Sequence, residues 1–245
     1  MRINEILFEK REDVSVVDDE QGKPQITIGD VIIRSEKYTP DQVVRRPVFH
    51  VLRRILSSDK DDEFVAARDH TKALNLVKLM GMHFHDVDPE DYGLMWDGNK
   101  LATNNTPSNI VHDVAHWQMA HKDRKFVPEF GLGDGPETTD TEIANQFVDK
   151  SIESMEEEKD SSFLGILWEL ALGMNSPRFT IEQHQWVGRY LRKDDDYSRE
   201  YYECDSFDNM DAIFTRLHSH GMIDIKGRPT LFVNLLNLHP RKTNA

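Results

Sequence analysis

The chain has 245 residues, of which 38% are hydrophobic and 30% are charged, and its formal net charge is −14. This acidic excess excludes non-specific binding to nucleic acids and to anionic membranes, because both need a basic surface on the protein. A basic protein partner would suit the charge. The longest apolar run, Phe163 to Gly173, contains Glu169 and is too short to cross a bilayer.

Cysteine usage and the first residues indicate the compartment. Cys204 is the only cysteine, so no disulfide can form within the chain. The first ten residues carry too many charges for a secretory signal peptide. Both features predict a cytoplasmic protein.

The N-terminal segment predicts short strands. Val14–Val17, Gln25–Ile28 and Val31–Ile33 are runs rich in β-branched residues, and turn-forming residues separate them. We expect a small antiparallel sheet or a flexible arm with a hairpin. No chemistry is visible in this segment.

Two helices are expected next. Thr39 followed by Pro40 is a typical helix start, and the apolar positions that follow predict a helix to about Ser57. A second amphipathic helix is expected over residues 61–80, with Gly81 at its end.

The centre of the chain carries a histidine pair. His112 and His116 are four residues apart, so on a helix both imidazoles lie on one face. Asp113 follows the first histidine and is turned away by about 100°. This is the H-E-x-x-H metalloenzyme motif with Asp in place of Glu. It predicts a divalent metal site on a helix over residues 108–121. The spacing alone also allows one buried and one exposed histidine.

A metal site of this kind needs a third ligand, usually a carboxylate. Residues 140–173 are expected to form one continuous helix whose apolar stripe is interrupted by Glu156, Glu157 and Glu158. Three consecutive acids cannot all face solvent, and a buried carboxylate needs a partner or a metal. Glu158 lies beside the apolar stripe and is the predicted ligand, with Glu156 as the next choice. A charged bulge or a helix break is the alternative interpretation.

Three further segments complete the chain. The Gly-rich loop from Phe130 to Glu137 is expected to fold over the histidine pair. A helix is expected over residues 180–192, in which we interpret His184 as a structural residue. A helix from Asp208, followed by a hairpin over residues 222–233, is expected to pack on the core.

Several of these segments together resemble a known family. The segment His112–Trp117, the Glu129–Gly131 loop and an acidic helix ending at Gly173 resemble the elongation factor P hydroxylases. The likeness covers about residues 107–175. It implies a metalloprotease-like helical core and a non-haem iron enzyme that hydroxylates a lysine side chain of a protein. The family carries Glu where this chain has Asp113, whose side chain is one methylene shorter.

The predicted ligands are compatible with two chemistries. Two histidines and one carboxylate suit iron(II) oxygenation and zinc hydrolysis alike. In a zinc hydrolase the acid after the first histidine activates the metal-bound water, whereas in an iron hydroxylase Asp113 could orient a histidine or bind a substrate amine. We therefore expect an iron-dependent hydroxylase-like enzyme with Asp113 as its catalytic residue and with His112, His116 and Glu158 as its ligands. A zinc-dependent hydrolase and a non-catalytic binding or structural protein are the alternatives.

The expected fold is mainly α, of the α+β class. Its parts are an N-terminal β segment or arm at residues 1–36, a helical metal-binding core at 37–205 and a C-terminal helix–hairpin at 206–245.

Overall fold

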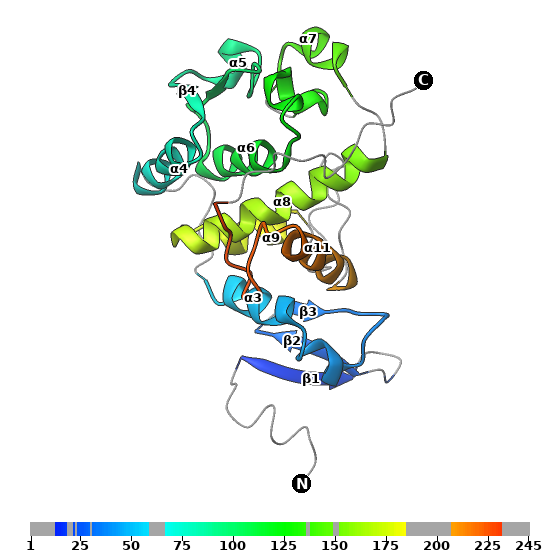
Figure 1. Ribbon diagram of the computed structural model, residues 1–245. Coiled ribbons are helices and arrows are strands. Elements are labelled where there is room, and N and C mark those ends of the chain that lie inside the picture. Colours follow the sequence, from blue (N-terminus) through cyan, green and yellow to red (C-terminus); the bar gives the residue numbers. More distant parts are fainter. Residues whose placement is uncertain are drawn as a thin grey trace.

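The computed structural model describes residues 13–18, 22, 24–29, 31–58, 67–135, 138–148, 152–184 and 207–231. The fold is mainly helical, with a small three-stranded sheet near the N-terminus and a helix near the C-terminus, as predicted (Figure 1).

The N-terminal sheet contains three antiparallel strands in the order β1-β2-β3. They are β1 (Val14–Asp18), β2 (Pro24–Ile28) and β3 (Val31–Ile33). Alternate side chains point to opposite faces of a strand. One face of this sheet is therefore buried through five aliphatic residues: Val14, Ile26, Ile28, Val31 and Ile33. The strand prediction is confirmed.

The helix expected from Pro40 to Ser57 is instead two helices, α2 (Pro40–Val43) and α3 (Pro47–Leu56). Pro47 has no N–H to donate and its ring clashes with a preceding helical turn. Arg46 accordingly takes an extended conformation, with φ −75° and ψ 138°. The prediction of one continuous helix is wrong for this reason.

The central part of the chain surrounds one long helix. Figure 1 shows α8 across the middle of the molecule, with the N-terminal sheet on one side and α4, α6 and α7 on the other. The remaining elements are α4 (Ala67–Leu79), β4 (His83–His85), α5 (Pro89–Tyr92), β5 (Lys100–Ala102), α6 (Pro107–Met119), η1 (Arg124–Phe126), η2 (Pro128–Gly131), α7 (Thr141–Gln146), α8 (Ile152–Leu172), α9 (Pro177–Gln183) and α11 (Phe207–Ser219). Strands β4 and β5 form a separate parallel pair.

The continuous helix expected over residues 140–173 is also divided. Helix α7 begins with Asp140 as its cap, whose carboxylate accepts the Ile143 N–H at 3.1 Å, and it ends at Gln146. Helix α8 starts at Ile152. The backbone carbonyl of Phe147 packs against Gly131, where an added Cβ would lie 3.2 Å from it. This loop contact is a tertiary feature, and helical periodicity does not encode it.

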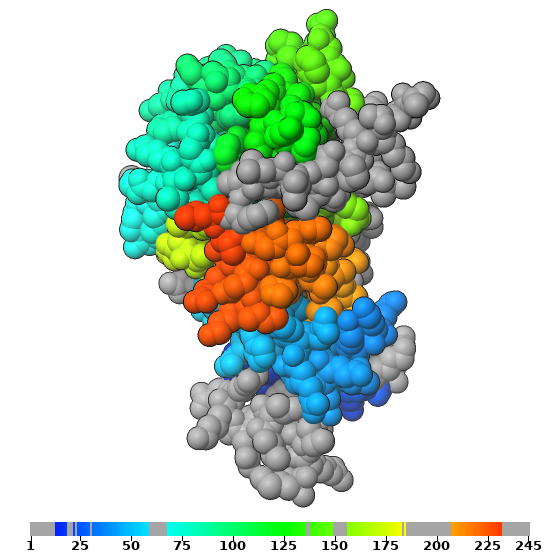
Figure 2. Space-filling model, in the orientation of Figure 1, coloured from blue at the N-terminus to red at the C-terminus, as the bar shows by residue number. Residues whose placement is uncertain are grey.

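The last part of the chain packs against earlier helices. The carboxylate of Asp211 on α11 accepts hydrogen bonds from Tyr38 and Arg46, at 2.9 and 2.7 Å. In Figure 2, α11 and residues 220–231 lie between the described N-terminal segment and the α4–α7 region. Within the described residues, the predicted hairpin is reduced to one bridge between Ile223 and Pro229. Its end, from residue 232 onward, lies outside them.

Three other predictions concern residues that lie partly or wholly outside the described part of the chain. The helix expected over residues 61–80 is one of them, and its described part, α4, begins at Ala67. The helix expected over 180–192 is seen as α9, and residues 185–192 lie outside the description, as does Cys204. Of the helices that are described, none has the length and apolarity needed to span a membrane.

A buried polar cluster joins α6, α8 and α9. The carboxylate of Glu169 is 1% exposed and accepts hydrogen bonds from the hydroxyls of Ser176 and Thr180, at 2.8 and 3.1 Å. Ser108 at the start of α6 contacts the same two hydroxyls. Burial raises the pKa of Glu169 to about 7, although the hydroxyls oppose this rise.

We expect Glu169→Gln to flatten the pH dependence of stability. The pKa of the Glu169 carboxyl is higher in the folded protein than in the unfolded chain, so the folded protein holds this proton more tightly. The resulting stabilisation is fully present below the ordinary pKa of the carboxyl and is lost as the pH rises through about 7. Between about pH 5 and 7, the free energy of unfolding of the wild-type protein should decrease with rising pH. Its slope should be steeper than that of the variant by about 1 kcal/mol per pH unit. Urea unfolding at several pH values measures this. Glu142→Gln, on the exposed side of α7, should keep the wild-type slope, and equal slopes for all three proteins would contradict the assignment.

Candidate metal centre

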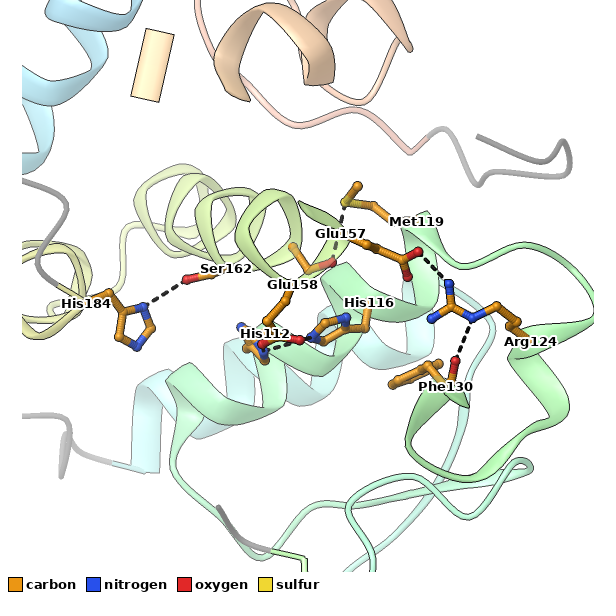
Figure 3. Close-up of polar contacts among 10 residues, drawn as sticks. His112, His116, Met119, Arg124, Phe130, Glu157, Glu158, Ser162 and His184 are labelled. Atoms are coloured by element: carbon orange, nitrogen blue, oxygen red, sulfur yellow. Dashed lines mark hydrogen bonds and ion pairs between the residues drawn. The ribbon is translucent and has the colours of Figure 1, made fainter. Parts of the chain in front are cut away.

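Helix α6 presents the two histidines on one face. Its start is defined by Thr106, whose hydroxyl accepts the Asn109 N–H at 3.3 Å, and by Pro107 at the first helical position. His116 is 4% exposed, and the side chain of His112 is 21% exposed. The predicted helix is present, and its pair of imidazoles faces α8 (Figure 3).

Helix α8 approaches α6 closely because of a glycine. A Cβ added at Gly165 would lie 3.3 Å from the Cα of His112 and 3.6 Å from its backbone nitrogen. Glu158 precedes this glycine by seven residues, which is two helical turns, so both lie on the face that meets α6. The missing side chain at Gly165 therefore lets Glu158 reach the histidines.

Three ligand atoms converge between these helices. The Nε2 atoms of His112 and His116 are 2.9 Å apart, and the carboxylate of Glu158 lies 3.2 Å from the first and 3.1 Å from the second. The three side chains are the group that could hold a metal ion. Two ligands that are each ~2.1 Å from one ion lie roughly 3.0 Å apart at a right angle and roughly 3.4 Å apart at a tetrahedral angle. The observed distances match one ion bound by all three.

The charges at this cluster favour an ionised carboxylate. Burial alone would raise the pKa of Glu158, but the charges of His116 and His112 and their hydrogen bonds hold it well below its ordinary value. An anionic oxygen beside two imidazole nitrogens is the donor set that binds zinc or iron(II) in proteins.

The three consecutive glutamates of α8 have three different partners. Glu156 is 39% exposed and pairs with Arg216 of α11 at 3.1 Å. Glu157 is buried and pairs with Arg124 at 2.6 Å. Glu158 alone lies at the histidines. Successive residues on a helix are turned by about 100°, and for this reason each acid meets a different neighbour.

Asp113 is not part of this cluster. Its side chain is buried, at 8% exposure, on the same helix as the histidines. Its carboxylate does not join the group of ligand atoms, which lie within 4.8 Å of one another. The structure therefore brings together three of the four residues predicted for the site.

The loop after α6 has a strained backbone. Glu129 and Phe130 both have positive φ, 48° and 53°, which costs about 1–3 kcal/mol per residue when the side chain is not glycine. The carboxylate of Glu129 accepts hydrogen bonds from the backbone of Met95 and the hydroxyl of Thr138, at 2.8 and 2.9 Å. Burial raises its pKa to about 7, while these hydrogen bonds and the charge of His116 oppose the rise.

This loop folds back toward the histidines, as its sequence predicts. The ring of Phe130 stacks on that of His116, with centroids 5.7 Å apart and an interplanar angle of 19°. Figure 3 shows the side chain of Arg124 between the Phe130 carbonyl and Glu157. The described residues do not include Pro136 and Glu137 at the end of the predicted loop.

Sequence reasoning missed the place of His184. Its Nδ1 lies 2.9 Å from the hydroxyl of Ser162, one helical turn after Glu158. Burial lowers the pKa of His184 to about 3, with a further lowering by His112, whereas Glu158 acts in the opposite direction. His184 is thus within electrostatic range of the cluster. No spacing in the sequence links it to the histidine pair, because the two segments meet only through the packing of α8.

Comparisons with protein-family models, with curated proteins and with solved structures gave no match to this chain.

A bulky side chain at Gly165 should separate the two ligand-bearing helices. We expect Gly165→Leu to lower the free energy of unfolding by about 1–3 kcal/mol, because overpacking forces the surrounding backbone to shift. It should also weaken metal binding, since Glu158 would move away from the histidines. Chemical denaturation and metal titration test both effects. Ala171→Leu, at an exposed position of α8, should change neither quantity, and unaltered metal binding by Gly165→Leu would contradict this account.

Proposed function

We propose that this chain is a metal-dependent enzyme that binds one divalent ion through His112, His116 and Glu158. The observation that carries the proposal is the convergence of two imidazole nitrogens and one carboxylate within hydrogen-bonding distance of one another. Two nitrogen atoms 2.9 Å apart cannot both carry protons toward each other. A shared metal ion satisfies all three groups at once.

Iron(II) is the metal that we favour. Two histidines and one carboxylate are the ligands of the facial triad that holds non-haem iron(II). In a zinc hydrolase the acid after the first histidine would have to act as the base at the metal-bound water, and Asp113 is one methylene shorter than the Glu of that motif. The likeness of the His112–Trp117 segment to the elongation factor P hydroxylases agrees with iron. When bound, iron(II) would supply the activation of molecular oxygen.

The chain's own residues would have separate tasks in such an enzyme. The two histidines and Glu158 hold the ion, and Phe130 covers one face of His116. Asp113, which is buried on the ligand helix and lies outside the ligand cluster, would orient His112 or bind the substrate amine rather than take a proton from water. The proposed substrate is an amine-bearing side chain of a protein, and a net charge of −14 would favour a basic partner in the cytoplasm.

A zinc-dependent hydrolase is the second candidate. The observation in its favour is the ligand set itself, because two histidines and a glutamate also hold catalytic zinc. A binding or structural protein without catalysis is the third possibility, in which the cluster would be a hydrogen-bonded ion pair.

Metal analysis of protein purified without chelators tests the proposal. We expect an equimolar amount of iron in the wild-type protein. His112→Ala should lose most of this metal because only two ligands remain. His83→Ala, an exposed histidine on β4, should retain it. Zinc in place of iron would favour the hydrolase. Wild-type protein that binds neither metal would overturn both enzymatic functions.

Oxygen consumption separates the two enzymatic functions. With iron(II) restored, a two-electron reductant such as ascorbate supplied and basic proteins offered as substrates, the wild-type protein should consume one O2 for each hydroxyl group formed, with the second oxygen atom leaving as water. Glu158→Gln should not consume oxygen in this way. If Asp113 acts only by orienting a ligand, the Asp113→Asn variant should retain the metal, and its rate of substrate hydroxylation should be about 10-fold lower than that of the wild type. Hydrolysis of the same substrates without oxygen uptake would exclude the hydroxylase.

A further inference from the structure

The second histidine lacks the polar contact that usually orients a metal ligand. A ligating imidazole normally donates its other ring N–H to a carboxylate, a carbonyl or water. The Nδ1 atom of His116 is buried and has no hydrogen-bond partner among the described residues. Another contact must therefore hold the plane of this ring.

The ring of Phe130 is in the position to do so. It lies nearly parallel to His116, with an interplanar angle of 19° and a centroid separation of 5.7 Å. The Phe130 ring also stacks on Trp96, with a centroid separation of 5.3 Å and an interplanar angle of 4°. The indole N–H of Trp96 is itself fixed, because it donates to the carbonyl of Lys125 at 3.0 Å. Phe130 is thus nearly parallel to both His116 and Trp96, and Trp96 is anchored to the backbone.

The loop maintains this stack against an unfavourable backbone conformation. Two successive left-handed residues, Glu129 and Phe130, turn the phenyl ring toward α6. Four hydrogen bonds hold the turn. The Glu129 N–H donates to the Trp96 carbonyl at 2.8 Å, the Glu129 carboxylate accepts from the Met95 N–H and the Thr138 hydroxyl, and Arg124 donates to the Phe130 carbonyl at 2.7 Å. A strained conformation that is supported from several sides points to a role at the neighbouring site.

The same arginine connects the loop to the helix that carries the third ligand. Arg124 donates to the Phe130 carbonyl through Nε and to the carboxylate of Glu157 through Nη1, at 2.6 Å (Figure 3). Glu157 directly precedes Glu158 in the sequence. The buried Arg124–Glu157 ion pair therefore connects the loop that carries the phenyl ring to the helix that carries the carboxylate ligand.

We propose that Phe130 is the positioning residue of His116, and that ring stacking replaces the missing hydrogen-bond acceptor at Nδ1. This role rests on the proposed metal binding at His112, His116 and Glu158. The aromatic ring is required for it, whereas a hydrophobic side chain of similar size would fill the space without fixing the plane of the imidazole.

Three variants and the metal ion Co²⁺ test the role. Phe130→Leu keeps an apolar side chain and removes the ring, and Phe130→Tyr keeps the ring. Phe207→Leu is the matched control, because Phe207 is equally buried and loses an aromatic contact with Tyr38 far from the site. The measurements are Co²⁺ affinity by chelator competition, the visible spectrum of the Co²⁺ complex and the melting temperature.

We expect Phe130→Leu to weaken Co²⁺ binding by about 10-fold and to change the spectrum, and Phe130→Tyr to keep both near the wild type. Phe207→Leu should lower only the melting temperature. Wild-type affinity and spectrum in Phe130→Leu, or an equal loss in Phe207→Leu, would overturn the positioning role alone. A wild-type protein that does not bind Co²⁺ would overturn the proposed function as well. Phe130→Met repeats the test if Phe130→Leu does not fold.

Discussion

The close packing of α6 against α8 is the constraint on which the candidate site depends. A Cβ added at Gly165 would lie 3.3 Å from the Cα of His112, which is tighter than an ordinary contact. At this separation a carboxylate two turns earlier on α8 reaches both imidazoles of α6. A wider gap between the helices would take Glu158 away from both histidines and would break up the group of candidate ligands.

The three successive acids of α8 have three different structural tasks. Each glutamate is turned by about 100° from the next. The helix therefore directs one acid to α11 through Arg216, one to the loop through Arg124 and one to the histidines. The first two pairs connect α8 to α11 and to the loop after α6, and the third acid faces the site. A single acidic run thus combines structural ion pairs with a candidate ligand.

Local patterns allowed much of the fold to be predicted. The three N-terminal strands follow from β-branched runs, and the helix expected over residues 108–121 is present as α6, Pro107–Met119. Two long helices were predicted where the chain has pairs of shorter ones. The break at Pro47 was readable from the sequence, since proline cannot continue a helix. Helical periodicity did not indicate the break after Gln146, where Phe147 packs against the loop at Gly131.

The sequence by itself determined the histidine pair, because helical spacing places residues four apart on one face. It also led to Glu158 as the predicted third ligand and to a loop from Phe130 over the histidine pair. Only the tertiary structure showed that Glu158 rather than Glu156 meets the imidazoles, that Asp113 lies outside the cluster, and that His184 lies near it. The physical reason is that spacing along one helix is a local property. Contacts between helices depend instead on a packing distance, which here is set by one glycine.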